Sequence, residues 1–223
     1  MTGTGTLIVF IRAPVPGRVK TRLAPALAND QIVSLYRAFV QDVLETAGRV
    51  CQPVTVAYTP PETEIEVRRW LGAAYRYRPQ SGNDLGRRMA DAFRGAFAAG
   101  FHWALVLGSD LPDLPASHLR TAVRAVARTG AVLGPSIDGG YYLIGFRADR
   151  FTPAVFEGIA WGSRGVRRQT IAAAQTGAVP VHQLPAWPDV DTPEDLEALC
   201  RRLPAQPDRA PRTRAWLQAA GRL

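Results

Sequence analysis

The stretch that decides the fold is Leu105-Val106-Leu107-Gly108-Ser109-Asp110-Leu111-Pro112. A wholly apolar run ends in Gly-Ser-Asp, and Pro112 prevents the run from continuing as a central strand. Such a run predicts a strand buried in a parallel sheet. Asp110 would lie at the carboxyl end of this strand, where open α/β sheets bind their ligands. Its carboxylate suits a divalent cation held against phosphate oxygens, although an Asp before Leu-Pro is also ordinary turn chemistry.

A basic loop, residues 12–22 (RAPVPGRVKTR), follows the first predicted strand, residues 6–11. It stands at the first strand-to-helix connection, but it lacks the leading glycine of a P-loop and Lys20 does not directly follow Gly17. Its side chains suit a diphosphate, and a solvated loop is the alternative. Among the 27 basic residues of the chain only Lys20 is a lysine, which hints that a compact ammonium is needed there. The four cations of the loop are Arg12, Arg18, Lys20 and Arg22.

Two more polar stretches are expected at the ligand edge of the sheet. Residues 80–89 (QSGNDLGRRM) combine a loop with a helix start, and Leu85, Met89 and Phe93 then form an apolar helical stripe. This helix N-terminus favours an anion or a polar base, or it is a plain cap. Residues 134–145 (GPSIDGGYYLIG) place two glycines after Asp138 and predict a returning antiparallel strand, with either a ligand site or a simple hairpin turn between the strands.

The last acidic stretch is residues 187–196 (WPDVDTPEDL). Thr192, Pro193 and Asp195 form a capping box for the next helix, which leaves Asp189 and Asp191 free. These two lie two apart on extended backbone and point to opposite sides, so at most one of them shares a site with Asp110. Residues 204–223, rich in Pro and Arg, predict a peripheral appendage after a single domain of residues 1–203.

Composition excludes several classes of protein. The chain has 223 residues and no apolar stretch near the roughly 20 residues of a membrane span, so we expect no membrane partner. The net charge of +8 comes from arginines scattered over many predicted helices without interleaved aromatic residues, which argues against a nucleic-acid partner. Cys51 and Cys200 have no metal-type spacing and suit buried thiols in a reducing cytoplasm.

Five motifs, taken together, resemble a known family. In chain order they are FIRAPVPGRVKTRL (10–23), DLGRRM (84–89), GSDLP (108–112), GPSIDGGYYLIG (134–145) and DVDTPEDL (189–196). They resemble the bacterial GT-A-fold transferases named arsenosugar-biosynthesis glycosyltransferases, also called radical-SAM/selenodomain-associated transferase 1. The resemblance spans roughly residues 6–203. It implies a Rossmann-like α/β/α sandwich with a mixed, mostly parallel sheet that binds a nucleoside diphosphate and Mg²⁺ or Mn²⁺.

On this resemblance we expect the transfer of a sugar from a nucleotide-diphospho-sugar donor to a small-molecule acceptor. The usual Asp-x-Asp metal motif of GT-A folds is reduced here to Asp110. In the related nucleotidyltransferases a residue just before the last helix supplies the second metal ligand, and Asp191 is the residue that the resemblance implies for this role. Asp110, Lys20 and Asp138 are the expected catalytic residues, with Asp138 orienting or deprotonating the acceptor hydroxyl. The expected nucleotide ligands are Arg12, Arg18, Lys20, Arg22, Asp84, Gly86, Arg88 and Ser109. The expected acceptor ligands are Asp138, Gly139, Gly140 and Trp161, the last of which is otherwise a core residue.

Two other hypotheses fit the same sequence. A nucleotidyltransferase would use the basic loop for a nucleoside triphosphate, and a substrate phosphate would attack the α-phosphate without a general base. A non-catalytic nucleotide-binding subunit gains weight from the single carboxylate of the metal motif. The base, the sugar, the acceptor and the oligomeric state do not follow from the sequence.

Overall fold

The computed structural model describes residues 3–223, in which seven strands form one sheet in the order β3-β2-β1-β4-β6-β5-β7. Only β6 runs against its neighbours, so the sheet is mixed and mostly parallel, as predicted. The strands are β1 (Gly5–Arg12), β2 (Val54–Thr59), β3 (Arg76–Pro79), β4 (Trp103–Gly108), β5 (Ala131–Pro135), β6 (Tyr141–Arg147) and β7 (Val181–Gln183).

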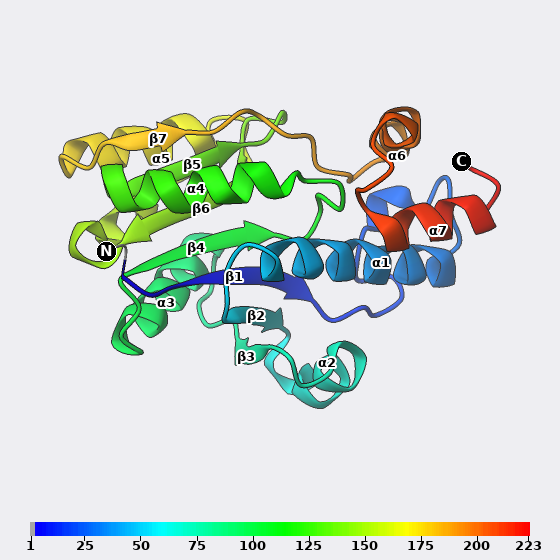
Figure 1. Ribbon diagram of the computed structural model, residues 1–223, viewed down its shortest axis with the longest axis horizontal. Helices are drawn as coiled ribbons and strands as arrows, with labels where there is room; N and C mark the ends of the chain where they lie inside the picture. Colours follow the sequence, from blue (N-terminus) through cyan, green and yellow to red (C-terminus); the bar gives the residue numbers. More distant parts are fainter. Residues whose placement is uncertain (1–2) are drawn as a thin grey trace.

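Helices cover both faces of this sheet (Figure 1). α1 and α4 pack on one face, and α3 and α5 pack on the other. The helices are α1 (Asn29–Gly48), α2 (Glu64–Leu71), α3 (Leu85–Ala98), α4 (Ala116–Thr129), α5 (Val166–Thr176), α6 (Pro193–Arg202) and α7 (Pro211–Ala219). The result is the α/β/α sandwich that the sequence predicts.

The alternation of side chains along β1 separates two apolar cores. Leu7, Val9 and Ile11 face α1 in the larger core, whereas Ile8 faces the aromatic cluster of α3 on the other side. Successive residues of a strand point to opposite faces, so both faces must be apolar where helices cover both. This explains why β1 and β4 are continuous apolar runs rather than alternating ones.

The helical stripe of α3 departs from prediction at its first residue. Phe93 is fully buried and packs edge-on against Phe146 with ring centroids 5.3 Å apart. Leu85, which the spacing places in the core, is 46% exposed. It is the first residue of α3, ahead of the turns that reach the sheet, and it lies at the edge of a cleft.

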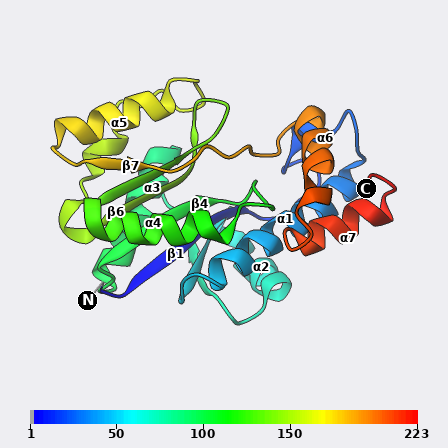
Figure 2. The ribbon, with the colours of Figure 1, turned by 45° about the horizontal axis from the view of Figure 1, so that its top comes forward.

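The C-terminal segment, residues 204–223, packs against α1 through its helix α7. α7 lies beside α1, and a long segment after β7 crosses the molecule to reach α6 next to them (Figure 2). Leu217 is fully buried, and Asp42 of α1 accepts hydrogen bonds from the backbone N–H groups of Arg212 and Thr213 at 3.1 and 2.8 Å. The segment that the sequence describes as an appendage therefore contributes to the larger core.

Cys51 and Cys200 are free thiols, and both are half-buried rather than buried. Within residues 3–223, the helices are too short or too polar for any of them to cross a lipid bilayer.

The topology sets the position of the candidate site. From β1 the chain winds outward to β2 and β3, and it then returns to place β4 on the other side of β1. The parallel strands β1 and β4 are paired as far as Phe10 and Gly108, and the segments that follow them lead away from each other, toward β2 and toward β5. Open α/β sheets bind ligands in the crevice at such a point.

Candidate functional site

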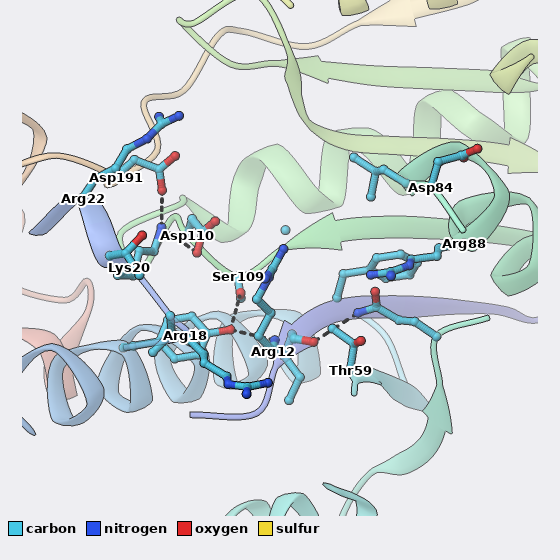
Figure 3. A pocket seen from close by; sticks show the side chains of 18 of the residues that line it. Arg12, Arg18, Lys20, Arg22, Thr59, Asp84, Arg88, Ser109, Asp110 and Asp191 are labelled. Atoms are coloured by element: carbon cyan, nitrogen blue, oxygen red, sulfur yellow. Dashed lines mark hydrogen bonds and ion pairs between the residues drawn. The ribbon is translucent and has the colours of Figure 1, made fainter. Parts of the chain in front are cut away.

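A cleft of about 660 Å³ opens at the carboxyl ends of β1 and β4 (Figure 3). Its walls come from the loop after β1, the residues that end β4, the start of α3 and the segment before α6. Lys20, Asp110 and Asp191 gather at one end of the cleft, and Asp84 and Arg88 lie at the other. Its lining residues are Phe10, Ile11, Arg12, Arg18, Val19, Lys20, Thr21, Arg22, Tyr36, Thr59, Gln80, Asn83, Asp84, Leu85, Arg88, Gly108, Ser109, Asp110 and Asp191.

All four cations of the basic loop line this cleft. The loop is held at two buried apolar residues, Val19 and Leu23, which lie on either side of Lys20 and Arg22. Lys20 itself has a left-handed backbone with φ of 45°, and its carbonyl accepts the N–H of Leu23 at 2.9 Å. These anchors fix the backbone of the loop, so the polar side chains between them face the cleft.

Lys20 bridges two carboxylates that are far apart in the sequence. Its Nζ lies 2.8 Å from Oδ1 of Asp110 and 2.5 Å from Oδ1 of Asp191, and its side chain is only 5% exposed. Burial by itself lowers the pKa of the Lys20 ammonium, but the charges of Asp110 and Asp191 outweigh burial and raise that pKa above its usual value. The Lys20 ammonium therefore stays protonated at neutral pH.

A hydrogen-bonded group joins the middle of the cleft to α1. The hydroxyl of Tyr36 accepts the backbone N–H of Arg12 at 2.9 Å and lies 3.3 Å from Oγ of Ser109. Burial, and then the charge of Asp110, raises the pKa of Tyr36 to about 12, so its hydroxyl stays protonated. Tyr36 is a buried residue of α1, and its place in the apolar core does not reveal from the sequence that its hydroxyl forms hydrogen bonds at the site.

The other end of the cleft is built on the start of α3. Asp84 caps this helix by accepting the N–H of Arg87 at 2.7 Å, and Nε of Arg88 donates to the carbonyl of Gly82 at 3.0 Å. Gln80, which the sequence analysis did not single out, donates from Nε2 to the carbonyls of Ile11 and Ala57 at 3.1 and 2.8 Å. Polar groups thus line this end of the cleft as well.

Comparisons with known proteins identify the family. Residues 42–163 match a family described as "Uncharacterized protein conserved in bacteria (DUF2064)". The chain is also 38% identical to a protein from Desulfovibrio desulfuricans G20 that is provisionally named a nucleotide-diphospho-sugar transferase. That similarity covers 96% of this chain and 94% of the other, with a TM-score of 0.90. The chain belongs to the DUF2064 family.

More distant solved structures share only the fold with this DUF2064 protein. A CMP:2-keto-3-deoxy-manno-octonic acid synthetase complexed with CTP is 14% identical, with a TM-score of 0.58 over 92% of this chain and 99% of the other. Rv0371c from Mycobacterium tuberculosis H37Rv, in complex with manganese, is 18% identical, with a TM-score of 0.52 over 89% and 99%. No curated protein sequence matches the chain. The fold is that of nucleotide-diphospho-sugar transferases and nucleotidyltransferases, as the motifs predict.

Five of the expected ligands, Asp138 among them, do not line the cleft of this DUF2064 protein. Gly86 lies against Trp161, because a Cβ placed on Gly86 would be 2.6 Å from Cζ2 of that ring. Trp161 lines a second cavity of about 700 Å³ between α3 and residues 153–161, which shares Asp84 with the cleft, and it packs on Phe156. Gly139 has a φ of 97° and Gly140 donates its N–H to Oδ1 of Asp138 at 2.9 Å, so both belong to the turn before β6.

Asp138 likewise lies outside the lining of the cleft, in the β5–β6 turn. Besides the N–H of Gly140, its Oδ1 binds the hydroxyl of Ser136. The turn that these bonds form is the hairpin alternative considered for this stretch. The catalytic role of Asp138 and the acceptor roles of Gly139, Gly140 and Trp161 stay predictions.

The segment before α6 follows the predicted alternation. Asp191 reaches the cleft, and Val190 is fully buried and donates its N–H to the carbonyl of Asp110 at 3.0 Å. Asp189 lies apart from the cleft lining. Its burial, followed by the charges of Asp191 and Asp138, raises its pKa to about 6. The capping box of α6 also forms as predicted, and Asp195 accepts the N–H of Asp191 at 3.1 Å.

A buried ion pair ties the Asp110 loop to the far end of α6. Asp113 is completely buried and accepts from Nε and Nη2 of Arg202 at 2.6 and 3.0 Å, and from Nε1 of Trp187 at 3.3 Å. Asp113 follows Asp110 by three residues and Arg202 ends the helix that Asp191 precedes, so this pair links the two segments that carry the carboxylates of the site.

The two carboxylates fit a divalent cation in part. Asp110 and Asp191 offer oxygens that converge on one point, now taken by Nζ of Lys20. No group of three or more acidic, His or Cys side chains within residues 3–223 is arranged to hold a metal ion. Mg²⁺ in phosphate-binding enzymes is commonly held by one or two carboxylates together with the phosphate oxygens of the substrate. The donor set therefore fits a cation that binds together with a phosphate ligand.

Proposed function

We propose that this DUF2064 protein is a glycosyltransferase that takes a sugar from a nucleotide-diphospho-sugar and transfers it to a small-molecule acceptor. One observation carries the proposal: four cations from a single loop line a cleft at the carboxyl ends of β1 and β4, and one of them, Lys20, lies against Asp110 and Asp191. The similarity to the Desulfovibrio protein, at 38% identity over nearly the whole chain, supports the same activity.

The diphosphate would lie at the end of the cleft that holds Lys20. Arg12, Arg18 and Arg22 would donate charge-assisted hydrogen bonds to its oxygens, and the hydroxyl of Ser109 would donate another. The start of α3, with Asp84 and Arg88, would receive the base or the ribose. Lys20 lies at one end of the cleft and Asp84 and Arg88 lie at the other, which supports this placement of the ligand (Figure 3).

Departure of the nucleoside diphosphate is the step that these cations would assist. As the bond between the sugar and the β-phosphate breaks, negative charge develops on the phosphate, and fixed positive groups stabilise it without reorganisation. Asp110 and Asp191 would hold Mg²⁺ or Mn²⁺, which when bound supplies further positive charge to the same leaving group. The acceptor hydroxyl would be oriented by Asp138, with Gly139 and Gly140 leaving room for the acceptor and Trp161 contacting it.

Transfer of a nucleotidyl group is a second candidate, and the position of Asp138 favours it. Its Oδ1 is engaged in the β5–β6 turn and its side chain does not line the cleft. A substrate phosphate that attacks the α-phosphate of a nucleoside triphosphate needs no general base, so this reaction does not depend on Asp138. It would release pyrophosphate, whereas sugar transfer would release a nucleoside diphosphate.

Thermal unfolding in the presence of ligands tests the proposal. The panel holds UDP, GDP, CDP, their sugar conjugates and the nucleoside triphosphates, each with and without Mn²⁺. A ligand at about 100 times its Kd adds roughly 2.7 kcal/mol to the free energy of unfolding, which raises Tm by about 5–11 °C for a chain of this size. The proposal predicts such a shift with one nucleotide-sugar and its loss in Asp110→Ala, but not in Arg124→Ala on the exposed face of α4.

Each outcome of that panel decides between the candidates. A shift confined to a nucleoside triphosphate, followed by release of pyrophosphate on addition of a phosphorylated acceptor, replaces sugar transfer by nucleotidyl transfer. Binding of a nucleotide with no turnover of any donor leaves a non-catalytic nucleotide-binding protein. No shift with any member of the panel contradicts the nucleotide site itself.

A further inference from the structure

The position of Lys20 has a consequence for metal binding. Its Nζ lies between Oδ1 of Asp110 and Oδ1 of Asp191, within 2.8 Å of both. A Mg²⁺ ion bound by the same two oxygens would lie about 2.0–2.1 Å from each of them. The ammonium and the metal would thus occupy the same small volume, and their like charges exclude simultaneous binding.

We infer that Lys20 is an exchangeable internal cation: it closes the Asp110–Asp191 pair to divalent metal in the free protein, and the pair opens when the ammonium moves onto the phosphate oxygens of a bound nucleotide. The first half of this inference stands on the ion pairs alone. The second half rests on the proposed function, because it requires a phosphate ligand in the cleft.

The loop around Lys20 is built so that only the side chain needs to move. Val19 and Leu23 are buried on either side of it, and the Lys20 carbonyl is held by the N–H of Leu23. The side chain also lines the cleft together with Arg18 and Arg22, so a diphosphate there would be within reach of the ammonium. A rotation about the side-chain bonds would therefore exchange one set of anionic oxygens for another.

The residue type fits an exchangeable cation as well. Lys20 is the only lysine among the 27 basic residues of the chain. An ammonium is a compact point charge on a flexible stem, whereas a guanidinium binds carboxylates through a rigid fork of several hydrogen bonds. Arginine at this position would hold the two carboxylates more firmly and release them less readily.

Binding of Mn²⁺, followed by electron paramagnetic resonance of the free ion, tests the first half without any measurement of activity. The proteins are the wild type, Lys20→Met, the double variant Lys20→Met/Asp191→Asn and the surface control Arg124→Ala. We expect Lys20→Met to bind one Mn²⁺ at least tenfold more tightly than the wild type and the control do, and the double variant to lose this gain. Equal binding by the wild type and Lys20→Met, or no binding by either, would overturn the inference.

A folding defect is separated from this result by a second variant. Lys20→Arg keeps a positive charge between the carboxylates, and circular dichroism of all variants reports whether they fold. We expect Lys20→Arg to stay closed to Mn²⁺ alone, as the wild type does. A Lys20→Arg protein that folds and binds Mn²⁺ as tightly as Lys20→Met would contradict exclusion by charge.

The second half is tested by adding UDP, GDP or CDP to the same Mn²⁺ titrations. We expect one of them to increase the affinity of the wild type for Mn²⁺ at least tenfold, and to do so less in Lys20→Arg. If Lys20→Met binds Mn²⁺ without nucleotide but no nucleotide changes the affinity of the wild type for Mn²⁺, the proposed function fails. The first half of the inference, that Lys20 closes the carboxylate pair to metal, then still stands. If nucleotides bind together with Mn²⁺ but Lys20→Met binds Mn²⁺ without nucleotide no more tightly than the wild type does, the inference about Lys20 fails and the proposed function stands.

Discussion

Removal of the Asp113 carboxylate tests how the site is held together. Asp113 has no exposed side-chain area and accepts two hydrogen bonds from Arg202 and one from Trp187. Asp113→Ala leaves the Arg202 guanidinium, which is 20% exposed, without its anion. Loss of one partner of a buried ion pair costs about 3–5 kcal/mol, which lowers Tm by about 6–20 °C for a chain of this length.

A double variant separates the cost of the unpaired charge from the value of the pair. Replacement of a buried pair by apolar side chains of similar volume is often close to neutral, so Asp113→Leu/Arg202→Met removes the uncompensated charge. The Trp187 N–H still lacks its acceptor, which costs about 1–3 kcal/mol. The double variant is therefore expected to be more stable than Asp113→Ala.

Urea unfolding followed by tryptophan fluorescence and circular dichroism measures these differences. The reasoning would be refuted if Asp113→Ala lost less than about 1 kcal/mol, or if the double variant lost as much as the two single variants together. Either result would mean that the pair does not hold the Asp110 loop against α6.

Three further predictions concern other contacts. Tyr36→Phe leaves the Arg12 N–H and the Ser109 hydroxyl without a partner and should lower the free energy of unfolding in urea by about 1–3 kcal/mol; an unchanged value would remove Tyr36 from the hydrogen-bonded group. Gly86→Ala places a Cβ 2.6 Å from Trp161 and 2.9 Å from the Phe156 carbonyl, so calorimetry should show a loss of about 1–3 kcal/mol, and an unchanged Tm would contradict the packing. Burial, and then the charge of Arg209, lowers the pKa of His118 below 6.5, so the unfolded chain takes up the proton first and the folded protein loses stability as the pH falls through and below that value. His118→Gln should therefore lose less stability than the wild type between pH 7.5 and about 5.5, and equal losses would exclude His118 as a source of acid sensitivity.

Local sequence patterns predict the parts of the site that lie next to each other in the chain. The apolar run that ends at Asp110 and the basic loop after β1 each combine a strand with the turn that follows it, and parallel strands bring such turns to one edge. The capping box of α6 accounts for Thr192 and Asp195 and leaves both Asp189 and Asp191, and the choice of Asp191 between them comes from the family resemblance.

The contacts that join distant segments are not predictable in the same way. Lys20 and Asp191 are 171 residues apart, and Asp113 and Arg202 are 89 apart. No periodicity or motif relates such positions, because their pairing depends on how α6 packs against the sheet. The packing of Gly86 is hidden from the sequence for the same reason, since the ring of Trp161 that lies against it comes from another part of the chain.

The most direct test of the account is calorimetric titration of the protein with a nucleoside diphosphate in the presence of Mn²⁺. UDP, GDP and CDP are titrated in turn into the wild type, Arg18→Ala/Arg22→Ala and the surface control Arg124→Ala. A hydrogen bond to a charged group contributes about 1.5–3 kcal/mol, so loss of two cations should weaken binding more than about a hundredfold. The account predicts one site per chain, lost in the double variant and kept in the control; equal affinity in all three proteins, or no binding to any, would contradict it.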